Sequence, residues 1–119
     1  MDLINVLKPD FVITGGDLIM DALATSYETA EHQYKLYNEC ISKLKMPVYN
    51  TIGNHEIWGW YIEDEVDTKH DDFGKKIFEN KVGKRYQAFD YKGWRFYIFH
   101  SVEKGERGYK GQINQEQMD

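Results

Sequence analysis

The order of apolar and polar residues predicts an α/β fold. Apolar runs at residues 11–14 and 48–52 are typical of strands, a helical pattern lies between them, and a paired-strand pattern follows at residues 86–99. Strand and helix patterns that alternate along a chain are typical of sheets covered by helices. No repeat, low-complexity tract or linker interrupts them, so we expect residues 1–119 to form one continuous domain segment.

The first predicted strand leads to an acidic side chain. Residues 1–8 have the pattern of a helix end, and Pro9 stops that helix. The apolar run at 11–14 ends at Gly15-Gly16, as expected of a buried parallel strand. Because ligands of α/β sheets gather at the carboxyl ends of strands, we expect Asp17 to lie at a binding edge.

The second strand follows an amphipathic helix. Apolar residues spaced three and four apart predict a helix over residues 27–44, ended by Pro47. Cys40 lies within this helix, and we expect it to be a buried or half-buried thiol without a catalytic role. The run at 48–52 then places Asn54 and His55 at another strand end, so the two strand ends converge.

The remaining patterns predict a helix, a hairpin and a helix start. Residues 73–80 read as a short helix, and Asn114 with a glutamine three positions later marks the start of another helix. Strands at 86–91 and 94–99 are joined by the two-residue turn Lys92-Gly93.

This turn fixes the register of the hairpin. It places three pairs opposite each other: Tyr91 and Trp94, Phe89 and Phe96, and Asp90 and Arg95. Both faces of the second strand are apolar or aromatic, so we expect that strand to be buried inside a sandwich.

Composition and charge argue against two classes of partner, without excluding a nuclease. With 41% apolar residues, 29% charged residues and no run of eighteen apolar residues, the chain has no segment that would span a membrane. The net charge of −5 argues against nucleic acid as a partner, because phosphate contacts need a basic surface. One cysteine makes no internal disulfide, and the sequence assigns no cellular compartment.

Two motifs carry residues suited to phosphate chemistry. Gly16-Asp17 is followed by Asp21, and Gly53-Asn54-His55-Glu56 follows the second strand. Carboxylate and amide oxygens suit hard or borderline cations, while a histidine moves a proton near neutral pH. The alternative is that both motifs are plain turns, with Asp17 as a helix cap and Asn54 as a left-handed turn residue.

The order of the two motifs resembles that of the calcineurin-like metallophosphoesterases. That family carries Asp-x-His, then Gly-Asp with a nearby Asp, then Gly-Asn-His-Asp/Glu, a lone His, and Gly-His-x-His; the second and third blocks are present here. The resemblance implies a partial α/β/β/α sandwich, truncated at both ends. The hairpin and Gly111-Gln112-Ile113, with the glutamine at 117, resemble the branch of purple acid phosphatases and cyclic-nucleotide phosphodiesterases.

The resemblance also implies roles for the motif residues. Two manganese, iron or zinc ions would activate water to hydrolyse a phosphate monoester or diester, with a small molecule or a nucleotide as substrate. Asp17 would bridge both ions, Asn54 would bind the second, and His55 would protonate the leaving alkoxide or stabilise the phosphoryl oxygens. Asp21 and Glu56 are candidates to orient His55; either of them, or neither, would do so. We expect the 119 residues alone to show little or no activity.

Other residues are weaker candidates. His100 is not expected to be a primary metal ligand, although it could line the cleft, and His32 and His70 are expected to be solvated. The aromatic run at 58–61 would either stack a nucleobase or aryl group or pack at the cleft rim. Two competing functions remain: a catalytically silent piece that binds a metal or a partner, and a structural domain with accidental motifs.

Overall fold

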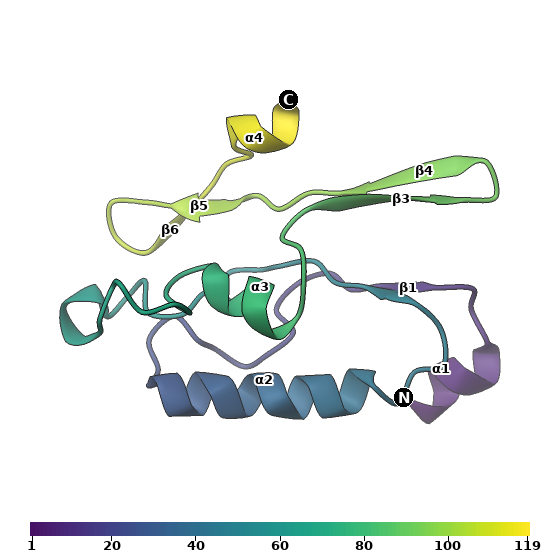
Figure 1. Ribbon diagram of the computed structural model, residues 1–119, viewed down its shortest axis with the longest axis horizontal. Coiled ribbons are helices and arrows are strands. Elements are labelled where there is room, and N and C mark those ends of the chain that lie inside the picture. The colour runs from purple at the N-terminus through teal and green to yellow at the C-terminus, as the bar shows by residue number, and fades with distance from the viewer.

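The computed structural model describes all residues from 1 to 119 and has mixed helix and strand content, as an α/β fold requires. In Figure 1, α2, the β1–β2 pair, the β3–β4 hairpin and α4 lie at successive levels. The expected sandwich of two full sheets stays a prediction. The elements in order are α1 (Asp2–Leu7), β1 (Val12–Ile13), α2 (Tyr27–Ile41), β2 (Val48–Tyr49), the 3₁₀ helix η1 (Glu63–Glu65), α3 (Lys76–Lys81), β3 (Gln87–Tyr91), β4 (Trp94–Ile98), β5 (Val102–Lys104), β6 (Tyr109–Gly111) and α4 (Gln115–Met118).

The first two strands pair in parallel, as predicted. Val12 lies opposite Val48, and Ile13 lies opposite Tyr49. The carboxyl ends of both strands therefore lie at the same edge. The expected burial of β1 was wrong, because Val12 is half-buried and Ile13 is 43% exposed. A sheet of two strands leaves one edge of each strand uncovered.

The helix α2 has the predicted amphipathic stripe. Its N-terminus is capped by Ser26, whose hydroxyl accepts a hydrogen bond from the Thr29 backbone N–H, and its buried residues are Ala30 and Tyr34. It ends at Ile41, three residues earlier than expected. Cys40 is exposed, so the expectation that its thiol is buried was wrong.

The helix α3 begins at Lys76 instead of residue 73. The cause is Gly74, which has a left-handed φ of 69° and exchanges two backbone hydrogen bonds with Trp58. A Cβ at Gly74 would lie 2.8 Å from the Trp60 Nε1 atom. Position 74 therefore requires glycine, and its left-handed backbone prevents a helix from starting before Lys76.

The β3–β4 hairpin has the register predicted from its turn. All three predicted pairs are present, and the Asp90 and Arg95 side chains form an ion pair at 2.7 Å. The turn residues Lys92 and Gly93 have φ values of 46° and 83°, as a two-residue hairpin turn requires.

One expectation for β4 was wrong, because the strand is not buried on both faces. The rings of Phe89 and Phe96 pack against Phe11, with centroids 5.1 and 5.3 Å from it. In contrast, Trp94 is 74% exposed and Tyr97 is 61% exposed.

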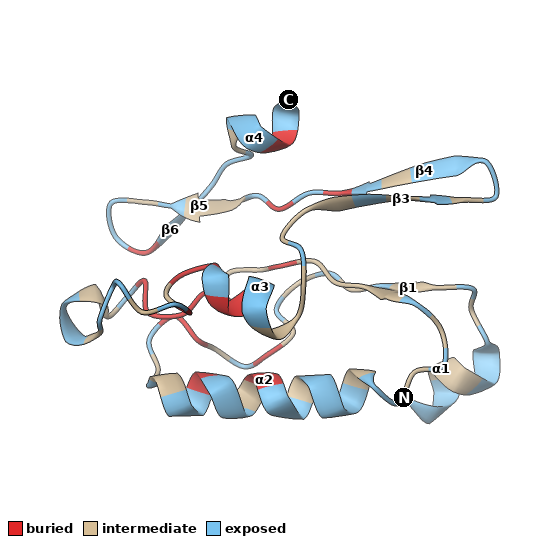
Figure 2. Cartoon of the chain, in the orientation of Figure 1, coloured by how far each residue is buried: buried red, intermediate tan, exposed pale blue.

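The hydrophobic core lies beside the strand ends. Figure 2 shows the buried segments between α2 and the loops that follow β1 and β2. The core joins α2 and α3 to both motif loops, and its members are Ile19, Ala22, Leu23, Ala30, Tyr34, Ile52, Ile57, Trp58, Trp60, Ile77 and Phe78. The motif loops are therefore anchored in the hydrophobic core.

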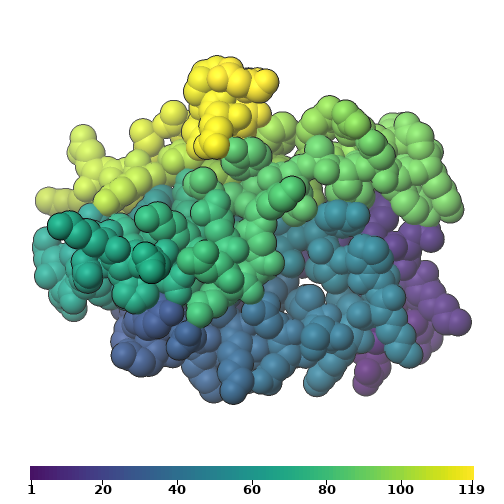
Figure 3. Space-filling model, viewed as in Figure 1, coloured from purple at the N-terminus to yellow at the C-terminus, as the bar shows by residue number.

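The C-terminal helix α4 stands out from the rest of the molecule in Figure 3. Its cap is the predicted one, since the Asn114 side chain accepts a hydrogen bond from the Gln117 backbone N–H at 3.2 Å. None of the helices is both long enough and apolar enough to cross a bilayer.

Candidate metal centre

Two glycine turns bring the sequence motifs into contact. Gly16 has a φ of 85°, and a Cβ there would lie 3.0 Å from both the nitrogen and the Cα of Gly53. A Cβ at Gly53 would lie 2.3 Å from the Asp17 Oδ1 atom. The two turns therefore pack backbone against backbone, and only glycine fits at either position.

The Asp17 carboxylate lies against the Gly-Asn-His turn. Its Oδ1 accepts a hydrogen bond from the His55 backbone N–H at 3.3 Å, and Asp17 is exposed. Asp17 itself has a left-handed φ of 50°, a conformation that Asp tolerates better than most residues. The carboxylate is thus bonded to the residue that directly follows Asn54, so the two strand-end motifs meet.

The Glu56 carboxylate is fully buried beneath these two turns. It accepts four backbone hydrogen bonds, from Gly53 at 2.6 Å, Asp17 at 2.9 Å, Ile19 at 3.2 Å and Leu18. Burial raises the pKa of Glu56, while the four backbone N–H groups act in the opposite direction because they favour the charged carboxylate. Sequence reasoning placed Glu56 near His55 but did not identify these backbone partners.

A backbone carbonyl orients the His55 ring. The Nδ1 atom of His55 contacts the carbonyl oxygen of Met20. Because a carbonyl only accepts, Nδ1 carries the hydrogen in this contact and Nε2 is left to act on another group. Every residue has a carbonyl, so no sequence signal could have identified this partner.

The two carboxylates expected near the His55 ring make other hydrogen bonds. The Asp21 Oδ1 accepts from the Leu23 backbone N–H at 2.9 Å, which is a local turn contact. The hydrogen bonds of Glu56 are those to the backbone described above. Orientation of His55 by Asp21 or Glu56 therefore has no supporting contact in this structure.

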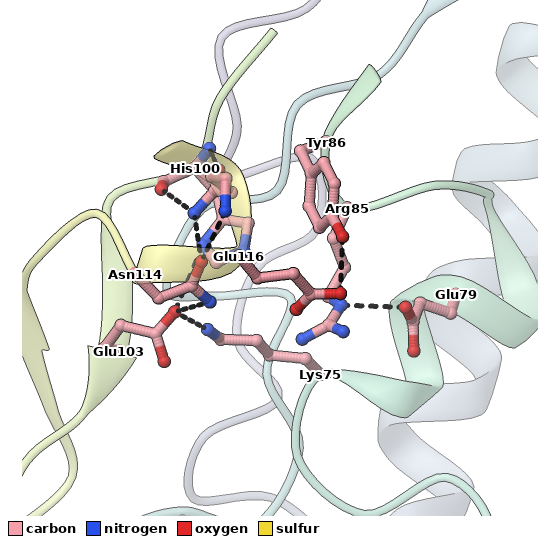
Figure 4. Close-up of polar contacts among 9 residues, drawn as sticks. Lys75, Glu79, Arg85, Tyr86, His100, Glu103, Asn114 and Glu116 are labelled. Carbon is pink, nitrogen blue, oxygen red and sulfur yellow. Dashed lines mark hydrogen bonds and ion pairs between the residues drawn. The ribbon is translucent and has the colours of Figure 1, made fainter. Parts of the chain in front are cut away.

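His100 lies in a separate polar cluster. Figure 4 shows it beside the yellow ribbon of α4, above Glu103 and Lys75. It is 1% exposed, and neither ring nitrogen has a hydrogen-bond partner. Burial is the main cause that lowers the pKa of His100, and the nearby Lys75 adds to it. Its polar neighbours are Gln117, Glu103 and Lys75, and none of them belongs to the two motifs.

The remaining aromatic and histidine candidates differ in exposure, and Tyr61, at the end of the aromatic run, is 53% exposed. Trp58 and Trp60 are buried in the core, so their rings are not presented for stacking a substrate. His32 is exposed, as predicted. His70 is half-buried against the rings of Tyr27 and Trp58, so the expectation that it is solvated was wrong.

The donor types at the strand ends suit a metal ion, but their number is small. Asp17 offers a carboxylate and Asn54 an amide oxygen, which are ligands for hard or borderline cations. No group of three or more His, Cys, Asp or Glu side chains in this structure is placed so that it could hold a metal ion. Two oxygen donors are fewer than the four to six ligands that such ions take in proteins.

Comparison with known proteins identifies the family. The family model of calcineurin-like phosphoesterases matches residues 1–116. The chain therefore belongs to the calcineurin-like phosphoesterase family, whose members are generally hydrolases of phosphoesters. Neither the curated proteins nor the solved structures gave a significant match.

Proposed function

We propose that these residues form part of a dinuclear metal centre that hydrolyses phosphate monoesters or diesters. Asp17 and Asn54 would hold the ions, which would be manganese, iron or zinc. When bound, the ions supply Lewis acidity that activates water and neutralises the phosphoryl oxygens. The observation that carries this proposal is the hydrogen bond from the His55 N–H to Asp17, because it joins the two motifs at one edge.

His55 would act as the proton donor in this reaction. The contact between Nδ1 and the Met20 carbonyl supports this role, because it would leave Nε2 free to face a substrate. A protonated Nε2 can transfer its proton to the leaving alkoxide as the bond to phosphorus breaks. General acid catalysis of this kind commonly contributes about 10²–10⁴ in rate.

The complete centre would need more ligands than Asp17 and Asn54 supply. We propose that the others come from segments outside residues 1–119, and that these residues are part of a larger two-sheet catalytic domain. The branch that contains purple acid phosphatases and cyclic-nucleotide phosphodiesterases remains our proposal for its relatives. Accordingly, we expect the isolated 119 residues to show little or no turnover.

Turnover by the full-length protein tests the proposal. With manganese, iron or zinc added, we expect hydrolysis of p-nitrophenyl phosphate or of bis-p-nitrophenyl phosphate. We expect Asn54→Ala to abolish this activity and His55→Ala to lower it by about 10²–10⁴. Matched controls are Asn38→Ala and His32→Ala, because both residues lie exposed on α2.

A second candidate function is a catalytically silent piece that binds a metal or a partner. The small number of protein ligands at the strand ends favours it. Tight metal uptake without turnover of either ester would support this candidate. Full activity in Asn54→Ala and His55→Ala would contradict the enzymatic proposal.

A further inference from the structure

The Glu56 carboxylate connects the backbones of both motif turns. Its Oε2 accepts from the N–H groups of Gly53 and Asp17, at 2.6 and 2.9 Å. Its Oε1 accepts from the N–H groups of Leu18 and of Ile19, the latter at 3.2 Å. One donor therefore precedes Asn54 and the other three begin at Asp17, so a single side chain spans the two turns.

Only an ionised carboxylate matches these four donors. An ionised carboxylate has two acceptor oxygens and no donor, so each oxygen can accept hydrogen bonds from two N–H groups. A glutamine amide in the same place would direct its NH₂ group at two backbone N–H groups. Because Glu56 is fully buried, water cannot take over the abandoned donors.

The rest of Glu56 is fixed as firmly as its carboxylate. Its carbonyl oxygen accepts a hydrogen bond from the Tyr34 hydroxyl of α2 at 2.5 Å. Tyr34 is itself fully buried in the core. The core therefore fixes the backbone of Glu56, and the carboxylate in turn fixes the two motif turns by hydrogen bonds.

We infer that Glu56 is a positioning residue that sets the affinity of the metal centre by holding Asp17 and Asn54 in register; this inference rests on the proposed function. Glu56 touches neither the metal ions nor the substrate in this role. Its loss would let the Gly53 turn shift against the Asp17 turn, which separates the two ligands. Residues that support metal ligands in this way typically contribute 10–100-fold to metal affinity.

The test compares Glu56→Gln with a matched variant of another buried carboxylate. Asp72 is 6% exposed and its carboxylate accepts from Tyr27 and Asn80, away from both motifs. Titration of the full-length protein with Mn²⁺ should show a dissociation constant raised about 10–100-fold in Glu56→Gln. Asp72→Asn also removes a buried charge, but it should leave the dissociation constant for Mn²⁺ within about twofold of the wild-type value. Glu56→Asp, which keeps the charge on a shorter side chain, should give an intermediate value and serves if Glu56→Gln does not fold.

Hydrogen exchange supplies a readout that needs no metal. In the metal-free protein, the amides of Asp17, Ile19 and Gly53 should be protected, and Glu56→Gln should lose that protection selectively. The same amides should remain protected in Asp72→Asn.

The outcomes separate this inference from the proposed function. If the wild type takes up Mn²⁺ and Glu56→Gln binds it equally well, the inference is overturned and the proposed function stands. If the wild type takes up none of manganese, iron and zinc, both are overturned. Unchanged amide protection in Glu56→Gln would show that the carboxylate does not hold the turns and would also overturn the inference.

Discussion

Two regions of the molecule each bury a titratable side chain, but only one of them supplies that side chain with hydrogen-bond partners. Glu56 at the strand ends and His100 near α4 are 0% and 1% exposed. The Glu56 carboxylate accepts four backbone hydrogen bonds, whereas both ring nitrogens of His100 lack a partner. The hydrogen bonds of His100 involve only its backbone: its N–H donates to the Gln117 side chain, and its carbonyl oxygen accepts from that side chain.

Both side chains are almost equally buried, so their hydrogen-bond partners, and not their burial, make the difference between them. Glu56 bonds to the motif turns through its side chain, whereas the ring of His100 is only packed. Burial shifts the pKa of each group toward its neutral form, upward for Glu56 and downward for His100. At Glu56 the four backbone donors oppose that shift, whereas at His100 the charge of the nearby Glu103 opposes it without a hydrogen bond to the ring. Those donors come from the two motifs that the proposed metal centre needs, whereas the contacts of His100 serve the docking of α4.

The largest contrast should come from replacing each side chain by leucine. Glu56→Leu leaves four backbone N–H groups without their buried acceptor, so we expect it to lower the free energy of unfolding by about 3–5 kcal/mol. His100→Leu removes a ring whose nitrogens have no partner, so we expect a change within about 1 kcal/mol of either sign. Urea denaturation of the full-length protein measures both values. Equal losses of unfolding free energy in Glu56→Leu and His100→Leu would contradict the difference that we draw between the two side chains.

A smaller effect is expected from adding one methyl group between the two turns. The Cβ of Gly53→Ala would collide with Asp17, and we expect a loss of about 1–3 kcal/mol in stability together with weaker metal binding. The control is Gly15→Ala, since a Cβ there meets nothing within 4 Å. Thermal unfolding of both variants checks the difference. A Gly53→Ala protein as stable as Gly15→Ala would show that the turns do not touch.

The smallest effect is a pH dependence that belongs to His100. Because the pKa of His100 is lowered in the folded protein, the unfolded chain takes up its proton first as the pH falls. The wild type should therefore lose stability relative to His100→Gln below about pH 6.5, with a constant difference above about pH 7.5. Urea denaturation between pH 5 and pH 8 measures this difference, and Glu56 cancels because both proteins carry it. Parallel profiles would show that His100 does not titrate differently on folding.

Local patterns predicted the hairpin and the motif positions well. The turn at Lys92-Gly93 fixed the register of every pair from Tyr91 and Trp94 onward, because a two-residue turn leaves one pairing. The parallel pairing of β1 and β2 followed from the strand-helix-strand order, and it placed both motifs at one edge. Each of these features depends on interactions between neighbours in sequence or on chain topology.

Contacts between distant residues could not be predicted in the same way. The Met20 carbonyl beside His55 and the donors to Glu56 are backbone groups, which no residue type marks. The late start of α3 depends on the close approach of Gly74 to the side chain of Trp60, which lies earlier in the chain and outside the local helical pattern. Aromatic content likewise does not show which rings, such as Trp58, are enclosed by the core and which, such as Trp94, are left outside.

The metal content of the full-length protein tests most directly whether the two turns form one centre. We predict two manganese, iron or zinc ions per chain in the wild type by elemental analysis. Asp17→Asn preserves a side chain that tolerates the left-handed backbone but removes the charge that we propose bridges the ions, so the content should fall below one ion per chain. Asn54→Ala should keep about one. Two ions per chain in Asp17→Asn would contradict the account.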